Sequence, residues 1–217
     1  EVSSNVNEVE LSFKLHCCSK LKDFVFKYED LLGKEIWDVL DEKIQEEPGA
    51  FLSAVNSYAT RKKNIRIYLL IDEYDNFTNT ILSTYGTEFY RKATHGEGFI
   101  RGFFNVIKSA TTGTGAALER LFITGVSPVT MDDVTSGFNI GTNITNDSWF
   151  NDLVGFSENE LREMLEYYKE QGVLQESIDE IVAMMKPNYD NYCFSEDTLE
   201  QCMFNSDMAL YFLKSFV

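Results

Sequence analysis

An acidic pair directly follows an apolar run in residues 67–75, which read IYLLIDEYD. Carboxylate oxygens are the ligands that Mg²⁺ takes at sites that handle phosphates, and a neighbouring carboxylate can polarise an attacking water molecule. We therefore expect Asp72 to hold Mg²⁺, directly or through water, and Glu73 to act as the catalytic base. The alternative is an acidic boundary between a strand and a loop that only solvates the turn.

The element that must position this pair is a β-strand. Residues Ile65–Ile71 form a nearly continuous apolar run with β-branched residues, which predicts a strand buried on both faces, as in a parallel sheet. An apolar strand that ends in Asp-Glu matches the Walker B pattern of P-loop nucleotidases, in which the strand end points at the phosphates. Asp75 is a further cofactor-binding candidate, which either orients the Mg²⁺ shell or caps the next segment.

A second apolar run, Arg120–Val126 (RLFITGV), predicts a second strand whose end carries Thr124. In P-loop ATPases with a strand inserted beside the Walker B strand, that strand end carries a polar sensor of the γ-phosphate. Thr124 is therefore the other catalytic candidate and would hold the lytic water or a phosphate oxygen. The alternative is a threonine that packs at a strand end. Arg101 and Arg120 are candidates for an arginine finger on a neighbouring subunit's nucleotide, or for surface salt bridges.

The sequence contains no Walker A motif. A phosphate-binding loop needs G-x-x-x-x-G-K-[ST], because its backbone amides and its lysine cradle the phosphates. The segment Gly33-Lys34-Glu35 lacks both the first glycine and the hydroxyl residue, and no lysine follows Gly113-Thr114-Gly115.

The remaining elements follow from periodicity and from helix signals. The strand, helix and strand around the acidic pair predict an α/β layer. Ser157 and Glu160 form a capping box at the start of a helix that should end at Gly172. Alternation predicts a further strand at Val9–Leu15. The other expected helices cover residues 36–44, 51–58, 98–110, 176–186 (ended by Pro187) and 206–216, so that a small helical subdomain begins near residue 155.

Composition restricts the class of protein. The 217 residues carry 19 basic and 35 acidic side chains, a net charge of −16, which argues against direct nucleic-acid binding and against binding to anionic membranes. No stretch approaches the roughly 20 apolar residues of a membrane span. The four cysteines fit neither a C-x-x-C pair nor a zinc site, so we expect free thiols in a reducing cytoplasm.

Several blocks of sequence, taken together, resemble the AAA-ATPase-like family. The blocks are LLIDEYDNF, FIRGFFNVIKSA, RLFITGVSPVTMDDVTSGFNIGTNIT, LVGFSENELREML and the ending MMKPNYDNYCFSEDTLEQCMFNSDMALYFL. Their order and spacing make the resemblance specific from about Ile65 to Phe216. VELSFKL, before that range, is similar to the family's strand after the P-loop helix.

The resemblance implies a P-loop NTPase-type α/β fold whose parallel sheet core is incomplete at the N-terminus. Residues 1–154 would be this core and residues 155–217 a helical, lid-like subdomain. Members of the family carry a Walker A region, here expected upstream of Glu1, and many end in a PD-(D/E)XK nuclease-like domain, here expected downstream of Val217. The implied cofactors are ATP and Mg²⁺. The implied function is a nucleotide switch that controls an attached or partner module. An oligomeric assembly of the chain is compatible with this function.

The chain departs from the family pattern in two segments. Asn191 and Cys193 stand where the family usually has glycine and arginine, and Ser127-Pro128 replaces the usual Thr-Lys or Thr-Arg after the TGV block. The missing Walker A motif and the substituted segment after TGV allow a second hypothesis, a degenerate, inactive ATPase fold that serves as a protein-binding or regulatory module. A nuclease acting through its own carboxylates is a third, disfavoured because no D…E-x-K spacing stands out.

Overall fold

The computed structural model describes the chain except for residues 1, 63–64, 113–115, 127–140, 200 and 215–217. It is a mixed structure of helices and strands, of which 65% is helical. Contacts divide the chain into two compact units, Glu1–Gly141 and Thr142–Val217, and each is described separately. Of the helices described, none combines the length and the apolar composition that crossing a bilayer requires.

The first unit contains a parallel pair of strands joined by two helices. β1 (Ile67–Ile71) pairs with β2 (Leu118–Ile123), and the register runs from Ile67 opposite Leu118 to Ile71 opposite Ile123. A parallel pair needs a crossover connection, which α6 (Asn76–Thr94) and α7 (Phe99–Thr111) provide. The prediction of a strand, a helix and a second parallel strand is confirmed at this level. The other helices of this unit are α1 (Val2–Lys27), α2 (Glu29–Leu32), α3 (Ile36–Val39), α4 (Glu42–Glu46) and α5 (Pro48–Arg61).

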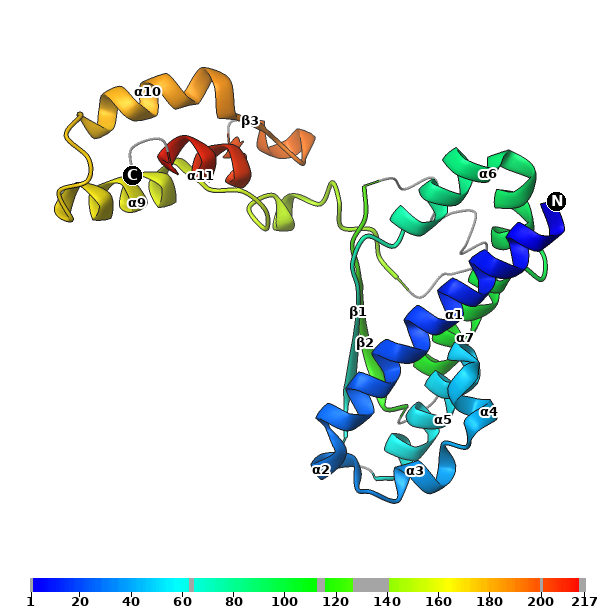
Figure 1. Ribbon diagram of the computed structural model, residues 1–217. Coiled ribbons are helices and arrows are strands. Elements are labelled where there is room, and N and C mark those ends of the chain that lie inside the picture. The colour runs from blue at the N-terminus through cyan, green and yellow to red at the C-terminus, as the bar shows by residue number, and fades with distance from the viewer. Residues whose placement is uncertain (1, 63–64, 113–115, 127–140, 200, 215–217) are drawn as a thin grey trace. The chain divides into compact units, whose positions relative to one another are not determined.

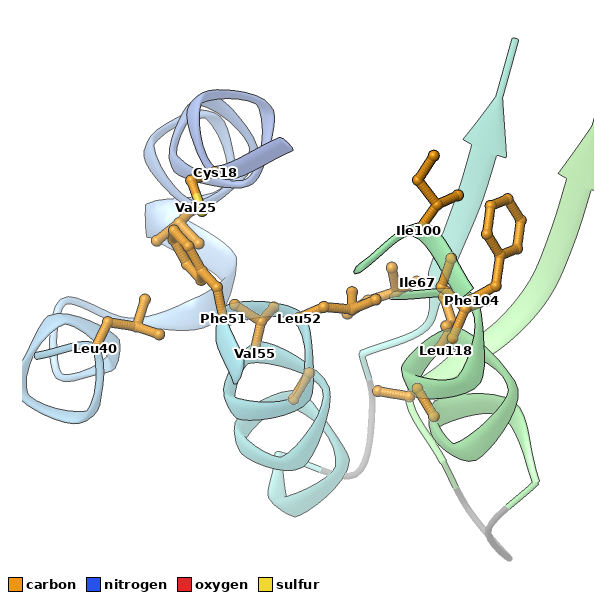
Figure 2. Packing of buried hydrophobic residues seen from close by; sticks show 14 of the residues in the cluster. Cys18, Val25, Leu40, Phe51, Leu52, Val55, Ile67, Ile100, Phe104 and Leu118 are labelled. Atoms are coloured by element: carbon orange, nitrogen blue, oxygen red, sulfur yellow. The ribbon is translucent and has the colours of Figure 1, made fainter. Parts of the chain in front are cut away.

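The hydrophobic core of this unit lies between the strands and the helices α1, α5 and α7 (Figure 1). Figure 2 shows Leu52 of α5 extending toward Ile67 of β1, with Phe104 of α7 next to Leu118 of β2. α5 and α7 carry polar residues on one side, whereas apolar residues at helical spacing are buried on the other side, as the sequence predicts. These two helices therefore cover one face of the sheet.

The other face of the sheet is exposed, so the prediction of a strand buried on both faces is wrong. Tyr68 and Leu70 of β1 are 63% and 73% exposed, and Phe122, opposite Leu70, is 44% exposed. Parallel sheets are normally covered on both faces by helices. Within the described residues of this unit, the core helices lie against one face only.

The N-terminal segment is a helix rather than the strand predicted at Val9–Leu15. Val9 and Phe13, four residues apart, pack against the core, whereas Leu11 and Leu15 are 56% and 63% exposed. Apolar residues continue along α1 at helical spacing, with Cys18 and Val25 fully or nearly buried. The alternation in seven residues was therefore part of a longer pattern of period 3.6.

The single helix predicted over residues 36–44 is interrupted at Leu40 and Asp41. Asp41 adopts an extended conformation and its carboxylate accepts a hydrogen bond from the Ile44 amide at 2.8 Å, which begins α4. Pro48 then starts α5 at its first turn, where a missing amide costs nothing. The predicted strand at 120–126 begins and ends earlier, since β2 stops at Ile123 and leaves Thr124 beyond it.

The second unit is mainly helical but also contains strands. Its elements are a 3₁₀ turn (Ser148–Phe150), α9 (Glu158–Glu170), α10 (Ile178–Tyr189), β3 (Asp190–Tyr192), a second 3₁₀ turn (Glu196–Thr198), β4 (Met203–Phe204) and α11 (Ser206–Lys214). The capping box of Ser157 and Glu160 is confirmed. The antiparallel pair β3–β4 was not predicted, because its strands are only three and two residues long.

The prediction that Pro187 ends its helix is wrong. Pro187 lies inside the last turn of α10, which continues to Tyr189. A proline removes one helical hydrogen bond and crowds the carbonyl four residues earlier, and here both costs fall at the helix end. The unit's own core forms where Leu161 and Leu165 of α9 meet Ile181 of α10, Phe204 and Leu213. The end predicted for the last helix, residue 216, lies outside the described residues.

Replacing Phe51 with alanine tests the position of the first core. Phe51 is 0% exposed and lies near Val25 and Leu40 (Figure 2). We expect Phe51→Ala to lower the free energy of unfolding by about 3–5 kcal/mol in urea denaturation, because it removes buried apolar surface and leaves a cavity. Leu31, 70% exposed on α2, is the control, and its alanine variant should change stability by less than about 0.5 kcal/mol. Equal effects of the two variants would contradict the packing described.

Candidate functional site

The ends of the two parallel strands lie side by side and form the candidate site. The ladder continues past the strands, since the Thr124 amide donates to the Ile71 carbonyl at 2.8 Å and the Tyr74 amide donates to the Thr124 carbonyl at 3.1 Å. Because the carboxyl ends of parallel strands meet at the same edge, residues that are about 50 positions apart in the chain become neighbours. The backbone of Thr124 is thus held on both sides by the strand and turn that carry the acidic pair.

Asp72 and Thr124 are in direct contact. The Thr124 hydroxyl donates a hydrogen bond to Asp72 Oδ1 at 2.5 Å. Asp72 is exposed and Thr124 is half-buried, so that carboxylate and hydroxyl oxygens meet at a surface that a solute can reach. The sequence predicts a role for each residue from a separate strand, and the register of β1 and β2 brings the two residues together.

Glu73 follows Asp72 in an uncommon backbone conformation. Its φ is +50°, and it is the only non-glycine residue with a positive φ among those described. Its carboxylate is exposed and accepts a hydrogen bond from the Asn76 side chain at 3.1 Å. Residues held in this region cost about 1–3 kcal/mol when the surroundings enforce them, and such residues cluster at functional sites. The turn therefore points Glu73 outward beside the first turn of α6.

Asp75 differs from the two preceding acids because it is buried, with 1% of its surface exposed. The Val126 amide donates to both of its carboxylate oxygens, at 3.2 and 3.1 Å. The Asn79 side-chain amide donates to Oδ2 at 3.2 Å. Asp75 is the residue before α6, but its side chain makes no capping hydrogen bond to the helix. Its carboxylate instead joins the turn after β1 to the turn after β2.

Gly125 permits this close approach of the two turns. A Cβ atom there would lie 2.2 Å from the Tyr74 ring and 2.7 Å from Asp75 Oδ1, distances that real side chains do not tolerate. The Tyr74 ring therefore occupies the space that a side chain at position 125 would need. The glycine after Thr124 is the signal in the sequence that corresponds to this contact, and its role becomes visible only in the folded chain.

A cavity of about 720 Å³ adjoins the candidate site. It lies along β1 and is lined mainly by apolar residues of α1, β1 and α7, with Asp72 and Glu73 among its walls at the end of the strand. His16 and Lys20 of α1 are its basic lining residues. The cavity was not predicted, because several of its lining residues belong to α1, part of which the alternation in Val9–Leu15 had indicated as a strand.

Cys17 of α1 also lines the cavity, and its surroundings disfavour the reactive thiolate. Burial, followed by the neighbouring Cys18 thiol, raises the pKa of Cys17 to about 12. The thiolate is the reactive form of cysteine, and at neutral pH this thiol is protonated. All four cysteines are free.

The candidate site fits a metal held mostly by other ligands. Within the parts of the chain that the structure describes, no group of three or more His, Cys, Asp or Glu side chains gathers around a common point. Mg²⁺ commonly takes one or two carboxylates and completes its shell with water and substrate phosphates. The exposed Asp72 carboxylate, with the Thr124 hydroxyl beside it, has the hard oxygen donors that this mode of binding needs.

The two arginine candidates lie on different elements. Arg120 is exposed on β2, opposite Tyr68, and Arg101 is half-buried on α7. An arginine-finger role for either stays a prediction. Ser127 and Pro128 lie outside the described residues.

Comparison of the sequence with known protein families identifies one family. A sequence model described as "Predicted AAA-ATPase" matches residues 1–135, which is more than half of the chain. The chain belongs to the AAA-ATPase-like family. The matched range of this AAA-ATPase-like chain includes Asp72, Glu73, Asp75 and Thr124. It also extends over α1, which precedes the range in which the sequence blocks made the resemblance specific. No curated protein and no solved structure matches the chain significantly.

Adding a methyl group at Gly125 tests the packing between the turns. We expect Gly125→Ala to lower the free energy of unfolding by about 1–3 kcal/mol, because the Cβ atom overlaps the Tyr74 ring and Asp75. Gly102 of α7 is the matched control, since a Cβ atom there meets nothing within 4 Å. Gly102→Ala should raise stability by about 0.5–1 kcal/mol, because alanine is the better helix former. Urea denaturation of both variants decides, and a neutral Gly125→Ala would contradict the close approach.

Proposed function

We propose that this chain forms the Walker B and sensor half of a P-loop-type ATPase core and works as a Mg²⁺-dependent nucleotide switch. The observation that carries the proposal is the hydrogen bond from Thr124 to Asp72 across the ends of two parallel strands. A metal-binding carboxylate and a γ-phosphate sensor in a P-loop ATPase occupy neighbouring strand ends of this kind. Membership in the AAA-ATPase-like family supports the same assignment.

Each residue of the site has a separate task in the proposed reaction. Asp72 holds Mg²⁺, which when bound neutralises charge on the β- and γ-phosphates. Glu73, exposed beside it, accepts the proton of the attacking water. Thr124 exchanges its hydrogen bond to Asp72 for one to a phosphate oxygen or to the lytic water, and so senses whether the γ-phosphate is present. Asp75 is buried and holds the turn after β2 through its hydrogen bonds from the Val126 amide.

Phosphate binding requires groups beyond those at the described site. The acidic residues of the site repel phosphate, and the 217 residues contain no G-x-x-x-x-G-K-[ST] motif. We propose that a phosphate-binding loop comes from another segment of the same protein, so that ATP is held jointly. In this proposal residues 1–154 are the ATPase-like core and residues 155–217 a lid-like subdomain, in a cytoplasmic protein. The switch controls an attached or partner module of nuclease-like type, and its oligomeric state is open.

One observation favours a regulatory module without turnover as the second candidate. The Asp72 carboxylate accepts a hydrogen bond from Thr124 of the same chain, so the two strand ends are joined without a nucleotide. Together with the missing Walker A motif, this arrangement suits a fold that retains its architecture and binds a protein partner.

A calorimetric titration of Mg-ATP into the protein that includes the proposed phosphate-binding segment separates the two candidates. We expect binding that weakens by about tenfold or more in Asp72→Asn, equivalent to about 1.4 kcal/mol, because the variant loses the Mg²⁺ carboxylate. Asp23→Asn removes the same charge from an exposed position on α1 and should leave the affinity unchanged.

The opposite outcomes are equally informative. Binding that is insensitive to Asp72→Asn and to removal of Mg²⁺ would show that the acidic pair is not the nucleotide site. No binding at all by the protein that includes the phosphate-binding segment would contradict the nucleotide switch and would favour the regulatory module.

A further inference from the structure

The three acids of the DEYD segment have different environments. Asp72 and Glu73 are exposed, whereas Asp75 is 1% exposed. A buried carboxylate is costly unless hydrogen bonds compensate for the lost water. The compensation for Asp75 includes the Val126 amide and the Asn79 side chain, and the former belongs to the turn after the other strand.

The contact between Asp75 and Val126 fixes the chain immediately after Thr124. On the preceding side, Thr124 is held by its amide to Ile71 and by its carbonyl to the Tyr74 amide. On the following side, Gly125 lies under the Tyr74 ring and the Val126 amide is bound by Asp75. Thr124 is therefore fixed from both directions, and the fixed backbone aims its hydroxyl at Asp72.

We propose that Asp75 is a positioning residue that holds Thr124 over Asp72 through its hydrogen bonds to the Val126 amide, rather than through its charge at a bound metal. The inference deepens the proposed function and depends on it only for the consequence for Mg-ATP binding. Without the Asp75–Val126 contact, the hydrogen bonds described for the turn after β2 end at Thr124, and we expect the threonine side chain to sample other rotamers.

The geometry predicts that asparagine can replace Asp75 but alanine cannot. Both carboxylate oxygens lie 3.1–3.2 Å from the Val126 nitrogen, so one oxygen of an asparagine suffices as acceptor. The NH₂ group of that asparagine is accommodated when the Asn79 amide turns to present its own oxygen. Alanine removes every acceptor and leaves the Val126 amide without this partner. A role that depends on negative charge predicts instead that asparagine and alanine are equally harmful.

The test is a nuclear magnetic resonance comparison of the wild-type chain with Asp75→Asn and Asp75→Ala. The two measurements are the hydrogen exchange rate of the Val126 amide and the three-bond couplings that report the χ1 rotamer of Thr124. We expect Asp75→Asn to match the wild type within about threefold in exchange and to keep one Thr124 rotamer. Asp75→Ala should exchange at least about tenfold faster at Val126 and should show averaged couplings at Thr124.

Two further variants keep the test decisive. Asn79→Ala removes only the second partner of Asp75 and should leave the Thr124 couplings unchanged. If Asp75→Ala does not fold, Gly125→Ala opens the same contact by steric overlap with Asp75 and Tyr74, and should average the Thr124 couplings in a folded protein. Loss of the Thr124 rotamer in both Asp75 variants, or in neither of Asp75→Ala and Gly125→Ala, would overturn the proposal.

Mg-ATP titrations connect the contact to the proposed function. We expect Asp75→Asn to retain the wild-type affinity within about threefold and Asp75→Ala to weaken it, because the sensor is then mispositioned. If the protein that includes the phosphate-binding segment does not bind Mg-ATP, the function proposed above fails, while the exchange rates and the couplings still decide the role of Asp75.

Discussion

The parallel pairing of β1 and β2 is the interaction on which the rest of this structure depends. It sets Ile71 opposite Ile123, so the residues that follow the two strands emerge at one edge. A parallel pair cannot be joined by a tight turn, and the connecting α6 and α7 supply both the crossover and part of the hydrophobic layer. Packing of α5 and α7 on one face fixes the strands in register. The contact between Asp72 and Thr124 is a consequence of that register.

The negative charge of this site suits metal binding but not phosphate binding. The described site contributes carboxylates and a hydroxyl, which suit Mg²⁺ and water, and the chain as a whole carries a net charge of −16. Phosphates need backbone amides or basic side chains around them. A site composed in this way can complete a nucleotide-binding centre but is a poor binder of phosphate alone. Because the groups that bind phosphate and the groups that act on water belong to different segments, ATP binding and ATP hydrolysis are separate measurements.

The acidic segment shows how one short motif contains residues with different physical roles. Asp72 is exposed at a strand end, Glu73 occupies a left-handed turn, and Asp75 is buried against the neighbouring turn. The sequence identifies these acids as a group, because residue type and spacing are visible in it. It left open whether Asp75 orients a metal shell or caps a helix. The contact that the structure places there, from Val126, lies 51 residues away.

Local patterns determined much of this protein from the sequence alone. The acidic pair after an apolar strand, the amphipathic α7 and the capping box at Ser157 each depend on residues close together in the chain, and each is present. The family resemblance depends on the order of such short blocks, and the family is confirmed. Long-range packing decided the rest. The segment Val9–Leu15 alternates over seven residues but is helical, because the apolar residues that follow it bury one face of a longer helix. Whether the sheet is covered on both faces, where the cavity lies, and why position 125 must be glycine depend on which distant segments meet. That information resides in tertiary contacts, whose geometry no short stretch of sequence specifies.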